Sequence, residues 1–142
     1  MGKQVSKREL QLEARKENLG EVLEALDELL EAADCPMKIQ MQLDIAVEEI
    51  FVNIASYAYA PEVGEAWIEI GITEDPLCAH ITFQDCGVPY DPLKKPDPDV
   101  TLAADERAIG GLGIFMVKKS MDDVQYKYEH GRNVLYLKKL LA

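Results

Sequence analysis

Three separated groups of residues in this chain could do chemistry together. In chain order they are Glu49 with Asn53, Asp85 with Gly87, and Gly110, Gly111 and Gly113, which precede an apolar run. Glycines let a backbone approach a ligand closely, and the free N–H groups at the start of a helix bind anions. A glycine turn that opens a helix is by itself weak evidence for a phosphate site, because short glycine-rich segments more often only form a backbone turn. The other two groups strengthen it.

In a nucleotide site each group has a natural task. The amide oxygen of Asn53 is a neutral hard ligand that can hold Mg²⁺ against phosphate oxygens. The carboxylate of Asp85 can accept a hydrogen bond from the exocyclic amine of adenine. Gly87 lets a base lie close to the backbone, and Gly111 and Gly113 can donate N–H groups to phosphates. The three groups together predict a site for an adenine nucleotide and Mg²⁺.

Each group also has a purely structural interpretation. The pair Glu48 and Glu49 could be a solvated helix face, which is the usual fate of paired glutamates. Asp85 could simply end a strand and start a turn. Asn53 fits a structural role less well, because Asn is a poor helix former and its neighbours here are apolar. We therefore expect its amide to have a partner.

Composition limits the classes of protein to consider. The chain has 142 residues, 48% of them hydrophobic and 29% charged, which predicts one soluble domain over residues 1–142. It has neither an apolar run of about eighteen residues nor a signal-like N-terminus, so we expect a cytoplasmic protein without a membrane segment. The net charge of −11 disfavours nucleic-acid binding and would attract a basic protein partner. Three cysteines without metal-ligand spacing and only two histidines make a zinc site unexpected.

Hydrophobic periodicity predicts an α+β fold. Residues 9–14 alternate like a half-buried strand with Leu10 and Leu12 inward. Apolar residues at three- and four-residue spacing predict helices at 19–33, capped by Asn18, and at 37–59. The remaining elements are a strand pair at 66–73 and 77–85, a helix at 112–121, and a strand pair at 124–129 and 133–140 with a turn at His130 and Gly131.

These elements predict a two-layer sandwich, in which a mostly antiparallel sheet is covered on one face by helices. The strand pairs imply antiparallel hairpins, and the helices do not alternate with parallel strands. A Rossmann fold is excluded, because the glycine motif opens a late helix instead of following the first strand. Residues 89–107, rich in proline and acidic residues, predict a lid, a binding loop or disorder.

The three groups resemble the motifs of one known family. Residues 46–53 are similar to its N box, residues 85–91 to its first glycine box, and residues 110–115 to its second. The family has the ATPase fold shared by histidine kinases and gyrase-type ATPases. Residues 111–123 and 131–135 resemble one branch of it, the anti-sigma factor serine kinases. The resemblance extends over about residues 9–140.

The resemblance implies roles for individual residues. Glu49 matches the general base that acts on a serine hydroxyl, and Asn53 matches the Mg²⁺ ligand. The other matches are nucleotide contacts: Asp85 and Gly87 for adenine, and Gly111 and Gly113 for the phosphates. This small set is chemically sufficient, because phosphoryl transfer needs mainly positioning and charge neutralisation.

The chain also departs from the family pattern. Tyr57 stands where relatives often have histidine, and Tyr90 replaces a phenylalanine; we expect both to be packing changes. Arg107 lies near the position of a family arginine that reaches the γ-phosphate, but its spacing from Gly111 differs. Lys94 and Lys95 are expected to be solvated. No phosphoacceptor helix of histidine kinases is present, so autophosphorylation on histidine is not expected.

Two functions are compatible with these features. The first is an ATP- and Mg²⁺-dependent serine/threonine protein kinase of the anti-sigma type, which phosphorylates an anti-sigma antagonist protein and, in another nucleotide state, binds a sigma factor. The resemblance also implies a homodimer. The alternative is a nucleotide-gated protein-binding module without kinase activity, which the unusual proline-rich acidic loop favours.

Overall fold

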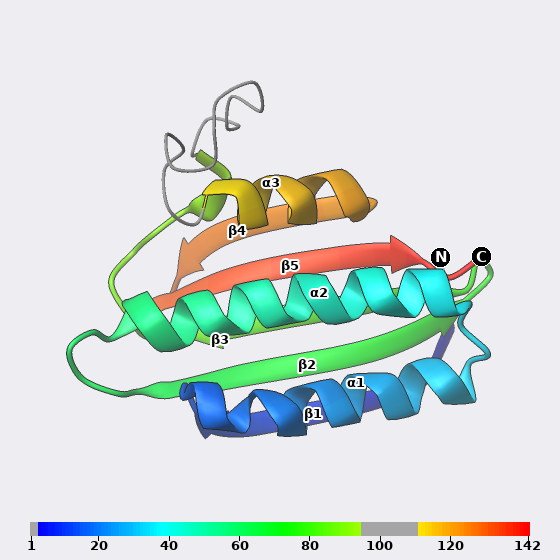
Figure 1. The fold of residues 1–142 in the computed structure, drawn as a ribbon, viewed down its shortest axis with the longest axis horizontal. Helices are drawn as coiled ribbons and strands as arrows, with labels where there is room; N and C mark the ends of the chain where they lie inside the picture. The colour runs from blue at the N-terminus through cyan, green and yellow to red at the C-terminus, as the bar shows by residue number, and fades with distance from the viewer. Residues whose placement is uncertain (1–2, 95–110) are drawn as a thin grey trace.

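In the computed structural model, residues 3–94 and 111–142 are described, and they form a sheet covered by helices (Figure 1). The five-stranded sheet has the order β1-β2-β3-β5-β4, and every neighbouring pair is antiparallel. Its strands are β1 (Lys3–Glu13), β2 (Glu65–Glu74), β3 (Cys78–Asp85), β4 (Asp123–Glu129) and β5 (Arg132–Leu140). Both predicted hairpins, β2–β3 and β4–β5, are confirmed.

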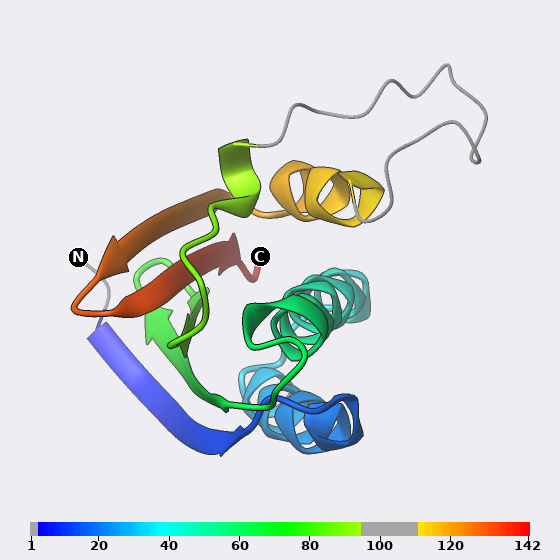
Figure 2. The same cartoon turned by 90° about the vertical axis from the view of Figure 1, so that its left-hand side faces the viewer.

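The helices lie together on one face of the sheet (Figure 2). They are α1 (Leu19–Ala32), α2 (Met37–Asn53) and α3 (Gly111–Ser120), with short 3₁₀ turns η1 (Lys16–Asn18) and η3 (Pro92–Lys94) and a π-helical turn η2 (Ile54–Ala58) that continues α2. This arrangement confirms the predicted two-layer α+β sandwich. Across the described ranges, no helix has the length and apolar character needed to cross a membrane.

The core fills the space between these two layers. The inward side chains of β2 and β3 alternate along the strands as predicted: Ala66, Ile68, Ile70 and Ile72, and Ala79, Ile81 and Phe83, are all buried. They pack against buried helix residues at three- and four-residue spacing, including Val22, Leu26, Leu30, Leu43, Val47 and Phe51. Each of the larger side chains among them, valine, leucine, isoleucine and phenylalanine, contributes roughly 1.5–3 kcal/mol when fully removed from water. This core fixes α2 over the middle of the sheet.

Strand β1 begins at Lys3, six residues earlier than the sequence pattern predicts. Most of the early residues are polar, but they lie on an edge strand, where side chains can remain in solvent. The backbone pairs with β2 from Lys3 opposite Glu74 onward. The side chain of Lys7 forms ion pairs with Glu9 and Glu69 at 3.0 and 3.4 Å. Backbone pairing thus extends the strand beyond its apolar alternation.

The prediction that the Asn18 side chain caps α1 is wrong. Asn18 directly precedes α1, but its backbone is already in the helical region because η1 leads into the helix. Its side-chain amide instead donates to the backbone carbonyl of Glu13 at 2.8 Å. Asn18 therefore stabilises the connection between β1 and α1.

Candidate functional site

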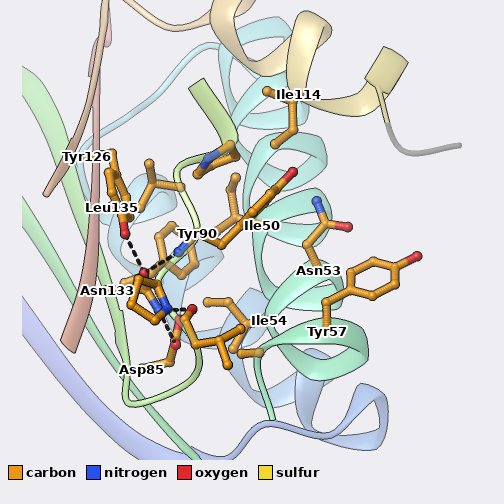
Figure 3. A pocket seen from close by; sticks show the side chains of 15 residues that line it. Ile50, Asn53, Ile54, Tyr57, Asp85, Tyr90, Ile114, Tyr126, Asn133 and Leu135 are labelled. Atoms are coloured by element: carbon orange, nitrogen blue, oxygen red, sulfur yellow. Dashed lines mark hydrogen bonds between the residues drawn. The ribbon is translucent and has the colours of Figure 1, made fainter. Parts of the chain in front are cut away.

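A cavity of about 570 Å³ opens between the C-terminal part of α2, the end of β3 and strands β4 and β5. This volume is typical of small-molecule sites. Figure 3 shows Asn53 and Tyr57 on the helix side, and Asp85, Asn133 and Tyr126 across from them. The apolar part of the lining comes from Ile50, Ile54, Phe83, Val88, Ile114, Leu135 and neighbouring residues. The cavity thus combines apolar walls with a few polar groups.

Glu49 and Asn53 form a hydrogen-bonded pair on α2. The side-chain nitrogen of Asn53 donates to Oε2 of Glu49 at 2.9 Å, as one helical turn of separation allows. This bond provides the partner that we expected for the Asn53 amide. Because the nitrogen faces Glu49, the amide oxygen is the atom that a cation could use. Asn53 also lines the cavity.

The first turn of α3 lies directly against Glu49. A Cβ atom placed on Gly113 would overlap the Glu49 carboxyl group, so a larger residue at this position would displace that carboxyl group from the start of α3. Gly111 is the first residue of α3, where backbone N–H groups have no partner within the helix. The next residue after Gly113, Ile114, lines the cavity. The fold therefore brings the second glycine motif to Glu49 and Asn53.

Asp85 is a buried carboxylate, only 5% exposed, at the end of β3. Its Oδ1 accepts hydrogen bonds from the backbone N–H of Gly87 at 2.9 Å and from the side-chain nitrogen of Asn133 at 3.0 Å. A buried carboxylate needs such partners to offset its lost hydration. With Oδ1 engaged, Oδ2 is the oxygen suited to a donor on a ligand.

Asn133 was not predicted as a site residue. It lies opposite Asp85 in the β3–β5 register. Besides Asp85, its side-chain nitrogen donates to the Val88 carbonyl at 2.9 Å, and its oxygen accepts from the Tyr90 backbone N–H at 3.0 Å and the Tyr126 hydroxyl at 2.5 Å. Two donors to the oxygen fix the orientation of the amide. The sequence feature that could have indicated Asn133 is its position: it is a polar residue at an inward position of a strand whose other inward residues are apolar.

Tyr126, on β4, is the second residue that the sequence did not indicate. Burial raises the pKa of its phenol above its ordinary value, and the hydroxyl donates to the side-chain oxygen of Asn133. Tyr57 and Tyr90, expected to be packing changes, both line the cavity. Aromatic side chains therefore border the cavity on both its helix side and its strand side.

Gly87 is close to the end of η2. A Cβ atom here would overlap the backbone carbonyl of Ala58, and the adjacent Val88 N–H donates to that same carbonyl at 3.2 Å. The Tyr59 hydroxyl supports the contact by accepting from the Cys86 N–H at 2.6 Å and donating to the Glu65 carbonyl, also at 2.6 Å. The glycine is thus needed for the loop after β3 to pack on the helix.

Several predicted features lie outside the described residues: Gly110, Arg107, Lys95 and most of the 89–107 loop. Lys94 ends η3. Within residues 3–94 and 111–142 there is no group of three or more His, Cys, Asp or Glu side chains arranged to hold a metal ion. A cation at Asn53 would therefore need further oxygen ligands, which nucleotide phosphates could provide.

Comparison with known proteins identifies the fold family. The family model described as "Histidine kinase-like ATPase domain" matches residues 12–139. The chain belongs to this family. The match spans all three predicted motifs, which confirms the resemblance inferred from them.

Individual members of the histidine kinase-like ATPase family are also similar to the chain. The serine-protein kinases RsbW of Bacillus thuringiensis subsp. konkukian and of a Bacillus cereus strain are 34% and 36% identical to it over 100 residues, which cover 68% of this chain and 61% of each relative. The chain thus matches less than two thirds of the length of these relatives. A crystal structure of the RsbU and RsbW domains of a Mycobacterium tuberculosis protein has the same fold, with a TM-score of 0.69 and 15% identity, over 96% of this chain and 33% of that one.

Proposed function

We propose that this histidine kinase-like ATPase is an ATP- and Mg²⁺-dependent serine/threonine protein kinase. The observation that carries the proposal is the position of Glu49: it is bonded to Asn53, in contact with the first turn of α3, and next to the cavity that contains Asp85. A carboxylate, an amide oxygen and a helix N-terminus together suit the transfer of a phosphoryl group to a hydroxyl. The similarity to serine-protein kinases supports the same reaction.

The residues present fit ATP and Mg²⁺. Apolar walls suit the adenine ring, and the second oxygen of buried Asp85 suits its exocyclic amine. The N–H groups at Gly111 and the residues after it suit phosphate oxygens. The Asn53 oxygen suits Mg²⁺ that also binds phosphates. We assign Gly87 to the adenine end, where it keeps the loop after β3 against η2.

In the proposed reaction Glu49 acts as the general base. When bound, ATP supplies the γ-phosphoryl group, and Mg²⁺ neutralises phosphate charge. The carboxylate of Glu49 would take the proton of the acceptor hydroxyl as the hydroxyl oxygen forms its bond to the γ-phosphorus, while the bond from that phosphorus to the bridging oxygen breaks and ADP leaves. The Asn53 amide holds the carboxylate in place, and the N–H groups at the start of α3 stabilise the negative charge on the transferred group.

The partners are proposed on the resemblance to anti-sigma factor kinases. The phosphoacceptor is an anti-sigma antagonist protein, and a sigma factor is bound in another nucleotide state. The functional form is a cytoplasmic homodimer. The name of the similar relatives, serine-protein kinase, supports a protein substrate.

The test is phosphotransfer from γ-labelled ATP with Mg²⁺ in an extract of the cells that naturally contain the protein. We expect the wild type to label a small protein, and Glu49→Gln to lower the rate by about 10²–10⁴-fold, since general-base catalysis is worth that much. ATP affinity should stay within about threefold, because Gln can still accept the Asn53 hydrogen bond. Glu48→Gln, at an exposed neighbouring position, is the matched control and should leave the rate unchanged.

Each result has a clear meaning. Transfer by Glu49→Gln at the wild-type rate would show that Glu49 is not the base. ATP binding without labelling of any protein would favour the nucleotide-gated module. If the wild type did not bind ATP, the proposed nucleotide site would be wrong. Asn53→Ala is the variant that tests the proposed Mg²⁺ ligand.

A further inference from the structure

Helix α2 has a row of large apolar side chains that face solvent. Met37, Met41 and Ile45 are 66%, 55% and 61% exposed, whereas Leu43 and Val47 on the same helix are buried. Single exposed apolar residues are common, but a contiguous row marks a binding surface. Methionine is frequent at such surfaces because its flexible side chain adapts to different partners. We call these three residues the α2 ridge.

The α2 ridge leads directly to Glu49. Its members are four residues apart, and the same spacing continues from Ile45 to Glu49 and Asn53, so the five side chains follow one another in a single row along the helix surface. At 1.5 Å per residue, Met37 lies about 18 Å from Glu49 along the helix axis, and Ile45 about 6 Å. A protein bound on the α2 ridge would thus extend to the proposed base.

Glu49 lies between the α2 ridge and the cavity. At about 100° per residue, it is about 40° around the helix from Ile45 in one direction and about 40° from Asn53 in the other. The cavity is lined by positions beyond Asn53 in that second direction, including Ile50 and Ile54. Because the proposed nucleotide occupies the cavity side, an acceptor hydroxyl has to reach Glu49 from elsewhere. The ridge side offers the apolar surface for it.

We propose that the α2 ridge is the docking surface for the protein phosphoacceptor, which covers it with an apolar patch beside its target serine or threonine. The inference rests on the proposed kinase function. It commits to the acceptor as the occupant because the exposed row ends at the residue where the acceptor must react. A second copy of this chain is the other possible occupant, but dimerisation does not require that the apolar row lead to Glu49.

The test measures the KM of three variants for their substrate, the phosphoacceptor protein that the labelling experiment identifies. Met37→Gln, Met41→Gln and Ile45→Gln together make the ridge polar while keeping good helix formers on α2. The three positions changed to leucine keep it apolar. Val5→Gln with Val63→Gln changes exposed apolar residues outside α2, at 57% and 46% exposure.

The glutamine variant should raise the KM for the phosphoacceptor at least about tenfold, since a few apolar anchors dominate protein binding. Its kcat and its Kd for ATP should stay within about twofold, because no residue of the proposed site changes. The leucine variant and the Val5/Val63 variant should keep the wild-type KM. A fall in kcat alone would not fit a docking surface.

Two results would overturn the proposal. One is an unchanged KM in the glutamine variant; if sedimentation then shows that this variant has lost dimerisation, the ridge is covered by a second copy. The other is loss of ATP binding in the glutamine variant, which would mean that the three side chains maintain the structure of the nucleotide site and do not bind the phosphoacceptor. If the wild type labels no protein although it binds ATP, the proposed function itself fails, which is a distinct result.

Discussion

Asn133 joins the parts of the cavity that surround Asp85. One side chain contacts the β3 carboxylate, the carbonyl of Val88 in the following loop, and the hydroxyl of Tyr126 on β4. Since Asn133 and Asp85 are both buried, these groups have little access to water. Loss of the amide would therefore leave several polar groups without partners at once.

We predict that Asn133→Ala lowers the free energy of unfolding by about 1–3 kcal/mol, the cost of leaving buried polar partners unsatisfied. It should also weaken ATP binding at least about tenfold, because Asp85 loses the contact that fixes its orientation. Urea unfolding and isothermal titration calorimetry measure the two effects. Tyr126→Phe is the milder comparison, since it keeps the hydrogen bonds that the Asn133 side-chain nitrogen donates, and it should cost about 1 kcal/mol. Wild-type ATP affinity in Asn133→Ala would contradict the positioning role.

Two glycines allow a matched test of close backbone approach. A Cβ at Gly87 meets the Ala58 carbonyl, whereas one at Gly20, within α1, meets nothing within 4 Å. Gly87→Ala should destabilise the protein by about 1–3 kcal/mol, as overpacking does. Gly20→Ala should stabilise it by about 0.5–1 kcal/mol through helix propensity. Chemical denaturation compares the two, and equal effects would show that the contact with η2 has no energetic weight.

At the scale of elements, the sequence identified every long helix and strand but not all of their limits. The alternating and three-to-four patterns of β2, β3 and α1 reflect burial on one side, which local sequence records well. The early start of β1 depends on backbone pairing with β2, which side-chain hydropathy does not encode. The π-helical end of α2 likewise goes with its contact to the loop after β3.

The interface of α1 and α2 holds a cluster of acidic residues. Gln40 donates to Asp27 at 3.1 Å and to Glu31 at 3.3 Å, and Asp44 lies close to both carboxylates. Burial, followed by the hydrogen bond and charge of Asp27, raises the pKa of Asp44 from 3.8 to about 7. Within the described residues, Oδ1 of Asp44 has no hydrogen-bond partner. Between about pH 4 and pH 7, the folded protein therefore holds a proton on Asp44 that the unfolded chain releases.

Because the pKa of Asp44 is higher in the folded state, the free energy of unfolding should fall as pH rises from about 4 to about 7 and change little above that. We expect this contribution to be about 1–2 kcal/mol, after allowing for solvent screening of a partly exposed group. Asp44→Asn should remove it and stabilise the protein at pH 8. Urea unfolding across pH measures the slope, with exposed Glu24→Gln as control. An undiminished slope in Asp44→Asn would contradict the assignment.

At the scale of the whole molecule, Asn53 and Asp85 line one cavity, and Ile114, directly after Gly113, also lines it. The contacts of Asp85 with Asn133 were not predicted from the sequence. Asn133 meets Asp85 because β5, not β4, is the neighbour of β3 in the sheet. Tyr126 then reaches Asn133 from the edge strand. This strand order is a property of the complete packing, so no local pattern around residue 133 could indicate its partner.

The net charge of −11 affects how this cavity takes up a nucleotide. ATP without Mg²⁺ is strongly anionic, so the field of the whole protein opposes its approach, and salt screens that field over a Debye length of about 10 Å at 0.1 M. Mg²⁺ reduces the charge of the nucleotide and, in the proposed site, is also held by Asn53. Mg²⁺ should therefore help binding through both the long-range field and the local site.

We predict that MgATP at about 100 times its Kd raises the free energy of unfolding by about 2.7 kcal/mol, as for any ligand that binds only the folded state. ATP with chelator at the same concentration should stabilise less. Adding salt should reduce that difference but not abolish it, because screening removes only the long-range repulsion and not the local contact. Thermal unfolding with MgATP and with ATP plus chelator, each at low and at moderate salt, measures these effects. Asp85→Asn should lose the stabilisation by nucleotide. If salt alone made free ATP as effective as MgATP, Asn53 would have no part in holding the ion, and the magnesium effect would be a property of net charge alone.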